Sequence, residues 1–501
     1  MIREPVHSED AVALHTFGFE LHRQGRVTEA EAFYRRALHL EPDFVTAWMN
    51  LGLAHVELGS YDSAEECERE ALRLDPDQPD AHNQLGMIHY KRGRLAEAEN
   101  CFRSALRLDP AHANATLNLG SVRQVFDHPE EAEGLFRRAI ALGVNAAHAH
   151  SNLALCLMEQ VRPVEAEAMC REALRERPNY PEAKANLALA LMMMGRLKEG
   201  WDYYETRWEV EGRNRPVPKL DTPRWTGQPL NGETVLLFAE QGFGDTLQFC
   251  RYAPMVAARG GRVVLVVPRA LRRLLMTLDG VSVLLAEDDD TMPGFDYHCP
   301  LLSLPYAFGT ELDTIPAAVP YLKADSHAWR PFLGSLPGLK VGLVWAGRSR
   351  TDQPHAVALD KRRSMHLFDM AALFDVPGVS FVSLQLGPPA RQMRCLPEDV
   401  LLHDVSARIA DWADTADLIA GLDLVIAVDT AVAHLAGALG KPVWMLNRYD
   451  SCWRWFVGRE DTPWYPTMRI FRQKARNDWT GVIAEVHATL SAYASRAGAG
   501  G

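Results

Sequence analysis

The hydrophobic and polar positions of the chain follow two patterns, and the change from one to the other falls near residue 234. Over the first two hundred residues, small and apolar residues recur every 34 positions, and six segments align without an insertion from residue 11. Alanine or glycine stands at the eighth and twentieth position of every segment, where two antiparallel helices can approach closely. A proline ends four segments, because proline lacks the N–H group that another helical turn needs. The pattern predicts an α-solenoid of six helix pairs over residues 11–214.

From residue 234 onward, short apolar runs alternate with helical stretches. The runs include "TVLLFA", "RVVLVVP", "LKVGLVWAG" and "LDLVIAVDT". Strands that are apolar along their whole length and alternate with helices are typical of parallel sheets buried on both faces. Roughly 260 residues exceed what one such sheet needs, so we predict two doubly wound α/β domains, at 233–335 and 339–490. A linker rich in proline and arginine at 215–232 and a flexible tail at 491–501 complete the predicted division.

The sixth segment departs from the others, since aromatic residues replace the usual alanines near its end. These residues are Trp201, Tyr203, Tyr204 and Trp208. Such a change is expected where a terminal repeat packs against another domain, because a bare solenoid end would expose its core.

Charge and composition exclude several classes of partner. The formal net charge is −12 and no block is rich in lysine or arginine, which argues against nucleic acid as the main partner. No apolar stretch is long and uncharged enough to span a membrane, and the first residues lack the apolar segment of a secretory signal. The eight cysteines are scattered without a CxxC pair, as in a reduced protein. We therefore expect a cytoplasmic protein with no membrane span.

A row of amide side chains marks the sixth position of the repeated segments. Its members are Asn50, Gln84, Asn118, Asn152 and Asn186. The first helix of such a repeat lines the concave surface, and amides there could bind the backbone of an extended peptide. Alternatively, the amides bond a neighbouring repeat or face water. The row predicts a groove for a protein or peptide partner, with this alternative left open.

The run "VIAVDTAVAHLAGALGKPVWML" is the richest candidate for ligand binding. A strand leads into Asp429 and Thr430, and a short helix follows. The first N–H groups of that helix, at Thr430, Ala431 and Val432, have no partner within it and would face the crevice at the strand ends. They could bind a diphosphate. The alternative is that Asp429 only caps the helix and His434 is a core histidine.

The stretch "EQGFGDTLQF" places Asp245 at another turn from strand to helix. A carboxylate in this position could take a proton from an acceptor hydroxyl, although helix capping is the alternative. Leu247 stands where a dinucleotide fingerprint needs its third glycine, and the lysine of a P-loop is missing. The polar and glycine residues around Asp245 are candidates for the acceptor side: Glu240, Gln241, Gly242, Gly244, Gln248 and Arg251.

The strand "VGLVWAG" ends in a third candidate loop, which contains Trp345, Gly347 and Arg348. A leaving diphosphate needs positive charge, which Arg348 or one of Lys361, Arg362 and Arg363 could supply, unless these are solvated surface charges. Gln385 ends another strand at the same edge and could hold a base or ribose. Residues 450–473 combine aromatic side chains with Arg454, Arg459 and Arg469, and could close the site or bind acceptor. The acidic run "EDDD" is interpreted as a solvated loop, so no metal site is expected.

Two family resemblances complete the sequence interpretation. "WMNLGLAH" is similar to the tetratricopeptide consensus, and the amide row resembles the asparagine ladder of O-GlcNAc transferase. "DTAVAHLAGALGKP" resembles the nucleotide-sugar motif of family 9 glycosyltransferases, the heptosyltransferases. The resemblance implies the GT-B architecture, a nucleotide-diphosphate sugar bound by Asp429 and Thr430 with His434 close behind, and Asp245 as catalytic base.

The implied activity is inverting, metal-independent sugar transfer to an acceptor hydroxyl, with no cofactor beyond the donor substrate. The repeats would present a protein or peptide acceptor. Two alternatives remain open: a repeat scaffold whose transferase domain is degenerate, and a nucleotide-sugar epimerase on the same architecture. A scaffold would leave Asp245 and Asp429 far apart, whereas an epimerase would need no acceptor.

Overall fold

The computed structural model describes residues 10–210, 220–348 and 354–499. The chain divides into two compact units, of which the first runs to Cys156 and the second takes nearly all residues from Leu157 onward. The sixth repeat therefore belongs to the same unit as the two sheets.

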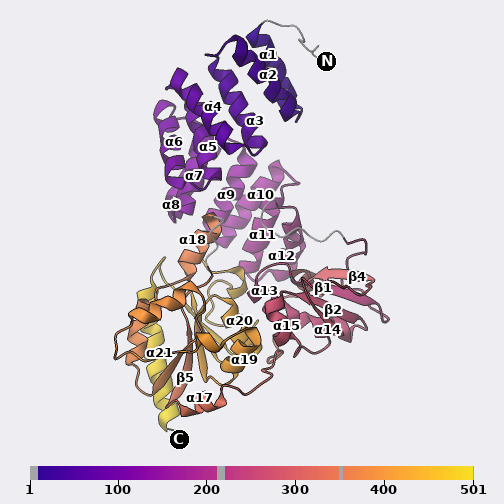
Figure 1. Ribbon diagram of the computed structural model, residues 1–501, viewed down its shortest axis with the longest axis vertical. Coiled ribbons are helices and arrows are strands. Elements are labelled where there is room, and N and C mark those ends of the chain that lie inside the picture. Colours follow the sequence, from indigo (N-terminus) through magenta and orange to yellow (C-terminus); the bar gives the residue numbers. More distant parts are fainter. Residues whose placement is uncertain (1–9, 211–219, 349–353, 500–501) are drawn as a thin grey trace. The chain divides into compact units, whose positions relative to one another are not determined.

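The first unit is a stack of antiparallel helix pairs, as Figure 1 shows. The helices are α1 (Ala11–Arg23), α2 (Val27–Leu40), α3 (Val45–Glu57), α4 (Tyr61–Leu74), α5 (Pro79–Lys91), α6 (Leu95–Leu108), α7 (Ala113–Val125) and α8 (Pro129–Ala141), with α9 (Ala146–Glu159) crossing the boundary between the units. A Cβ atom on Gly86 would lie 2.6 Å from the Phe102 ring, and one on Gly120 would lie 2.7 Å from Phe136. The predicted solenoid is confirmed, and these distances show why small residues recur in it.

The amide row bonds mainly to the preceding repeat. Asn50 Nδ2 lies 2.8 Å from His15 Nε2, and Asn118 Nδ2 donates to Asn83 Oδ1 at 2.9 Å. Asn152 Nδ2 donates to Ser121 Oγ at 3.4 Å. The Gln84 amide, oriented to satisfy both neighbours, donates to Met49 O and Glu68 Oε1. Asn186, in the second unit, is buried. These bonds match the neighbouring-repeat alternative. The four amides of the first unit remain half-buried, and their role as a peptide groove stays a prediction.

A buried carboxyl group replaces an aromatic ring in the second repeat. Glu68 in α4 is fully buried at the position where other repeats place Tyr34, Phe102 and Phe136. Burial raises the pKa of Glu68 to about 9, so the side chain is protonated at neutral pH. Because the pKa in the folded state lies above that in the unfolded state, the associated stability is present at low pH and is lost as pH rises through about 9.

We therefore expect Glu68→Gln to stabilise the first unit by about 1–3 kcal/mol near pH 8. Glutamine keeps an oxygen that can accept from Gln84 and cannot ionise. Thermal unfolding followed by circular dichroism between pH 5.5 and 9 measures the effect, and the advantage of the variant should grow with pH. Glu66→Gln, at an exposed position in the same helix, is the control. An advantage that is constant with pH would contradict the prediction.

The second unit begins with the remaining repeat helices and the first sheet. The helices are α10 (Pro163–Glu176), α11 (Pro181–Met193) and α12 (Leu197–Tyr204), followed by the 3-10 turn η1 (Glu205–Trp208). The first sheet contains β1 (Thr234–Phe238), β2 (Arg262–Val267), β3 (Val283–Ala286) and β4 (Tyr297–Pro300), all parallel in the order β3-β2-β1-β4. Its short helices are α13 (Phe243–Phe249), α14 (Ala253–Ala258), α15 (Arg269–Leu275) and α16 (Leu304–Ala307).

The second sheet is larger and also parallel, with the order β10-β9-β8-β5-β6-β7. Its strands are β5 (Leu339–Val344), β6 (Val379–Ser383), β7 (Leu402–Asp404), β8 (Leu424–Val428), β9 (Val443–Asn447) and β10 (Met468–Arg472). Its helices are α17 (Arg330–Ser335), α18 (Pro354–Arg363), α19 (Trp412–Ala420), α20 (Ala431–Ala438) and α21 (Trp479–Ala499). Two parallel α/β sheets after a solenoid confirm the predicted fold class.

The strand order fixes where a ligand would bind. In the second sheet the chain runs outward from β5 to β7 on one side, and from β8 to β10 on the other. The order therefore reverses between β5 and β8, and open parallel sheets bind ligands at the carboxyl ends of strands beside such a reversal. The loops that follow β5 and β8 contain Gly347 and Asp429, so two of the three candidate loops meet there.

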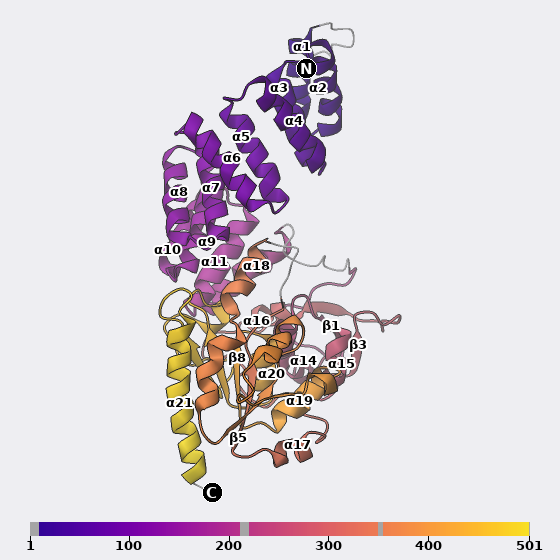
Figure 2. The same ribbon diagram turned by 60° about the vertical axis from the view of Figure 1, so that its left-hand side comes forward.

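Two segments differ from the sequence prediction. Residues 491–499, expected as a flexible tail, are the last turns of α21 (Figure 2), because this alanine-rich stretch continues a helix whose Leu490 is buried. Part of the predicted linker 215–232 packs on the first sheet instead: Trp225 is buried, and its backbone N–H donates to His298 O of β4 at 2.9 Å. Residues 211–219, 500 and 501 lie outside the described residues.

Candidate functional site

Two short helices, one after each sheet's central strand, pack their first turns against each other. Helix α13 follows β1, and α20 follows β8. A Cβ atom on Gly244 would lie 2.9 Å from His434 Cδ2 and 3.6 Å from Ala431 Cα. Only glycine permits this approach, and it brings Asp245 to the same region as the Asp429–Thr430 loop.

Asp245 uses both carboxylate oxygens. Oδ2 accepts from the N–H of Gly242 at 3.0 Å, which caps α13, and Oδ1 accepts from Arg454 Nη2. The capping alternative is thus observed, together with an ion pair that capping does not require. The side chains of Asp245 and Arg454 are 21% and 11% exposed, so the pair is largely removed from water.

Arg454 is held on several sides. Its Nε donates to Gln248 Oε1 at 2.9 Å, and its guanidinium carbon lies 4.3 Å from the centre of the Trp453 ring. Burial opposes the charged guanidinium, but the Asp245 carboxylate, Cys452 and Tyr204 together outweigh burial, so the pKa of Arg454 lies above its usual value. Gln248 is fully buried, and its Nε2 has no hydrogen-bond partner within the described parts of the chain.

His434 is a neutral core residue at the centre of this region. Its Nδ1 lies 3.0 Å from the Tyr465 hydroxyl, and its ring centre is 5.2 Å from that of Trp455. Burial lowers the pKa of His434 to about 4, against a smaller opposing effect of Asp429. The charges of Arg454 and Asp245 also act on this pKa, so all three charged groups share one electrostatic neighbourhood. A neutral imidazole supplies no positive charge for a phosphate.

Thr430 begins α20 without capping it. Its backbone is extended, with φ −140° and ψ 168°, and its side chain makes no capping hydrogen bond. The Thr430 hydroxyl is buried and has no partner among the residues that the structure describes. The first hydrogen bond of the turn runs from Ala433 N to Thr430 O at 3.0 Å, which leaves the N–H groups of Ala431 and Val432 ahead of it.

The loop after β5 is fixed by side chains from neighbouring elements. Gln385 Oε1 accepts from the N–H groups of Trp345 and Ala346 at 3.1 and 2.9 Å. The N–H of Gly347 donates to Ser364 Oγ at 3.0 Å. Buried Gln385 and Trp345 therefore hold the loop in place.

Among the basic candidates, Arg363 is the one beside Asp429. Its Nη1 lies 3.5 Å from Asp429 O, and it pairs with Asp360 at 2.7 Å. The guanidinium of Arg362 pairs instead with Asp450 at 3.0 Å, whereas Lys361 and Arg348 are exposed. Arg363 therefore lies at the strand-order reversal.

The acceptor-side candidates mainly connect elements. Buried Glu240 pairs with Arg207 of η1 at 2.8 Å, and Gln241 Nε2 donates to the Tyr204 hydroxyl at 3.2 Å. Arg251 donates to Pro316 O at 3.1 Å, Trp464 O at 2.6 Å and the Tyr321 hydroxyl at 2.8 Å. These side chains join the sixth repeat and both sheets into one framework around Asp245.

The aromatic residues of the sixth repeat complete this framework. The Trp201 ring lies 5.4 Å from Trp453 and 6.4 Å from Phe249, and its Nε1 donates to Thr310 O at 3.1 Å. The expected packing of the last repeat against another domain is thus observed. The arginine and tryptophan residues of 450–473 suggested from the sequence that this segment takes part in the site. The pairing of Arg454 with Asp245 was not predicted.

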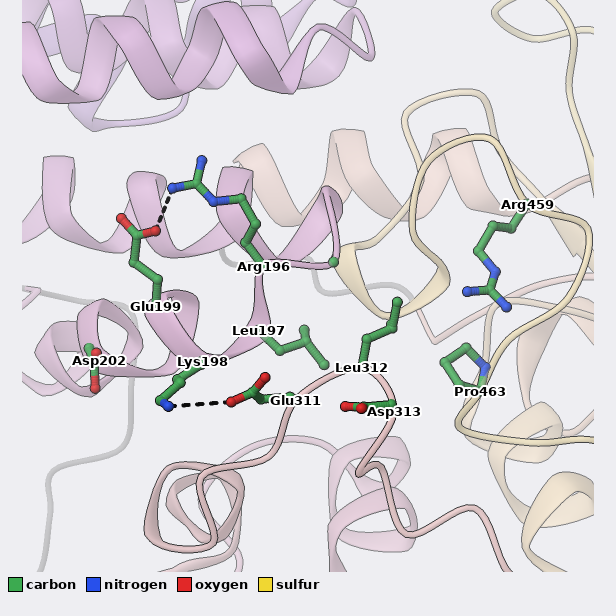
Figure 3. A pocket seen from close by; sticks show the side chains of 11 residues that line it. Arg196, Leu197, Lys198, Glu199, Asp202, Glu311, Leu312, Asp313, Arg459 and Pro463 are labelled. Carbon is green, nitrogen blue, oxygen red and sulfur yellow. Dashed lines mark hydrogen bonds and ion pairs between the residues drawn. The ribbon is translucent and has the colours of Figure 1, made fainter.

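A separate hollow of about 800 Å³ lies between α12, residues 311–313 and the loop at 459–463 (Figure 3). It is lined mostly by charged side chains, which include the pairs Arg196–Glu199 and Lys198–Glu311. Arg459, which the sequence suggested for closing the site or binding acceptor, lines this hollow, whereas Asp245, Asp429 and Thr430 do not.

Two general searches of the described residues have negative results. No helix in 10–210, 220–348 or 354–499 is long and apolar enough to cross a membrane. Within the same ranges, no group of three or more His, Cys, Asp or Glu side chains could hold a metal ion.

The fold and site define the class of protein: a tetratricopeptide-like solenoid joined to a parallel α/β region of the GT-B type. Comparison with known families agrees. Residues 5–191 match the C-terminal domain of cilia and flagella-associated protein 70, and residues 410–476 match glycosyltransferase family 9 (heptosyltransferase). The second match includes Asp429, Thr430, His434 and Arg454.

Similar proteins are found for parts of the chain. Protein FlbA of Caulobacter vibrioides is 29% identical over 337 residues, which are 60% of this chain and 54% of FlbA. The chain thus spans about half the length of this relative. Among solved structures, PilF of Pseudomonas aeruginosa is 20% identical with a TM-score of 0.35 over 39% of this chain and 87% of PilF. The Cut9–Hcn1 structure is 19% identical with a TM-score of 0.39, over 42% and 41% of the two chains.

Proposed function

We propose that this protein transfers a sugar from a nucleotide-diphosphate donor to an acceptor hydroxyl, with inversion at the anomeric carbon and without a metal or cofactor. The observation that carries the proposal is the contact of α13 with α20 at Gly244, which brings Asp245 beside the family 9 motif. The scaffold alternative predicts that Asp245 and Asp429 lie far apart, so the approach of the two loops at Gly244 supports the transferase.

In this proposal the loops after β5 and β8 bind the donor. The N–H groups of Ala431 and Val432, the buried hydroxyl of Thr430 and the guanidinium of Arg363 can all donate to phosphate oxygens. They would stabilise the charge that develops on the diphosphate as its bond to the sugar breaks.

Asp245 is the proposed base. The acceptor oxygen attacks the anomeric carbon, its proton passes to the Asp245 carboxylate, and the bonding pair of the broken C–O bond leaves with the diphosphate. A single displacement inverts the configuration. The repeats would recruit a protein or peptide, for which the half-buried amides of the first unit are candidates, and we place the reaction in the cytoplasm.

The first prediction from this proposal concerns Asp429. At least one of UDP-, GDP- and ADP-sugars should raise the melting temperature of the protein, since a ligand at a hundred times its Kd stabilises by about 2.7 kcal/mol. Asp429→Ala should remove most of this shift, because Asp429 leads into the donor loop. A thermal-shift titration measures both.

Asp399→Ala, at an exposed position of the same sheet domain, should keep the shift. If none of these nucleotide sugars stabilises the wild-type protein, the proposal is wrong. The epimerase alternative would be supported instead if the bound donor were converted to an isomer with no acceptor present.

A further inference from the structure

The Asp245–Arg454 pair joins the two sheets at the proposed reaction centre. Asp245 lies in α13 of the first sheet domain, and Arg454 follows β9 of the second, 209 positions away in the sequence. The pair is enclosed, since the guanidinium also stacks on Trp453 and binds Gln248. The attraction between the two charges in such surroundings is little screened by water and is stronger than in a surface pair.

This pair conflicts with base catalysis as long as it persists. Both Asp245 oxygens already accept hydrogen bonds, one from Gly242 N–H and the other from Arg454. While Arg454 donates to Oδ1, that oxygen faces the guanidinium and not an acceptor hydroxyl. Base catalysis through Oδ1 therefore requires that Arg454 turn to another anion.

The diphosphate of the donor is an anion of the right chemistry. It carries more charge and more acceptor oxygens than a carboxylate, and guanidinium groups bind phosphate oxygens in two-pronged fashion. Arg454 also lies near the proposed diphosphate loop, because its partner Asp245 follows Gly244, where an added Cβ atom would lie 3.6 Å from Ala431 Cα at the start of α20.

We propose that Arg454 is shared between Asp245 and the donor diphosphate, so that donor binding draws Arg454 away and frees Asp245 to act as base. This inference rests on the proposed transferase function. The Nη2 bond to Asp245 has to change, and two-pronged binding also takes Nη1 from Cys452 Sγ, which lies 3.3 Å away. The Nε bond to Gln248 and the contact with Trp453 can persist. The order of events follows: donor first, then proton transfer from the acceptor.

Sharing predicts opposite effects for the two partners. Asp245→Asn removes the anion that competes for Arg454, so a nucleoside diphosphate should bind about fivefold more tightly. Arg454→Gln removes the cation, so the same ligand should bind at least about tenfold more weakly. If the pair served only to hold the two sheets together, both substitutions would weaken binding.

Isothermal titration calorimetry of the full chain with UDP, GDP and ADP tests this, beginning with wild type. The double variant Asp245→Asn/Arg454→Gln should bind the nucleoside diphosphate as Arg454→Gln alone does, because the gain from Asp245→Asn requires Arg454. Arg454→Lys, which keeps the charge, should bind more tightly than Arg454→Gln, and it replaces that variant if Arg454→Gln does not fold.

The outcomes separate the inference from the function on which it rests. Tighter binding by Asp245→Asn and weaker binding by Arg454→Gln support sharing. Wild-type binding combined with unchanged or weaker binding by Asp245→Asn overturns the inference but leaves the transferase proposal intact. If the wild-type protein binds none of the three diphosphates, both proposals fail.

Discussion

Replacing Arg207 by alanine should lower the free energy of unfolding of the second unit by about 3–5 kcal/mol. The reason is the buried charge that the substitution leaves behind. The side chains of Arg207 and Glu240 are 5% and 2% exposed, and Glu240 also accepts from Leu302 N–H at 3.1 Å. Burial raises the pKa of Glu240, and Arg207 is the main group that opposes this rise.

Urea unfolding followed by tryptophan fluorescence measures the loss, since every tryptophan except Trp48 lies after Leu157. The loss of unfolding free energy in Arg207→Ala should be smaller at pH 5 than at pH 8, because Glu240 without Arg207 can take up a proton. Glu240→Gln added to Arg207→Ala should recover part of the stability. Arg269→Ala is the control, because it breaks an ion pair with Asp288 whose side chains are 56% and 58% exposed. A similar small loss for both arginines would contradict the prediction.

Gly244→Ala should destabilise the second unit by about 1–3 kcal/mol and weaken nucleotide-sugar binding about tenfold or more. The added Cβ would lie 2.9 Å from His434 Cδ2, so α13 and α20 would have to separate. Separation shifts the Ala431 N–H that is proposed to face the diphosphate.

The matched control is Gly134→Ala, an exposed helical glycine of α8 with nothing near the position of an added Cβ. There alanine should stabilise its helix by up to about 1 kcal/mol, as expected from helix propensity. Denaturant unfolding and calorimetry with the identified donor measure both properties. If Gly244→Ala bound the donor as wild type does, the helix contact would not govern the site.

The period of 34 and the unbroken apolar strands were sufficient to predict the fold class, because both patterns are local and repeat many times. The Asp429–Thr430 turn could be placed at a strand end for the same reason. The partner of Asp245 could not be predicted, since Arg454 is 209 positions away. Sequence patterns do not say which of several arginines will contact a carboxylate. The prediction of a linker was wrong at Trp225. It relied on the proline-rich composition of the segment and did not consider that one large apolar side chain could be buried against the first sheet.

Glu240 shows the same limit at shorter range. Its polar character beside Asp245 suggested contact with an acceptor, but burial and Arg207 give it a connecting role. Gln385 likewise uses its oxygen on the Trp345 and Ala346 backbone. Polar residues at strand ends thus divide into those that build the loops and those that are proposed to face a ligand, and only tertiary contacts separate the two groups.

The sixth repeat has a consequence for how such proteins can diversify. Trp201 packs on Trp453, the residue next to Arg454. Arg207 forms an ion pair with Glu240, which lies in the loop before Asp245. Changes in this repeat are therefore constrained by the chemistry of the sheets. The earlier repeats belong to the other compact unit. In the proposed transferase, exchange of the segment up to Cys156 between related chains would alter the recruited partner and leave the residues of the proposed reaction centre unchanged.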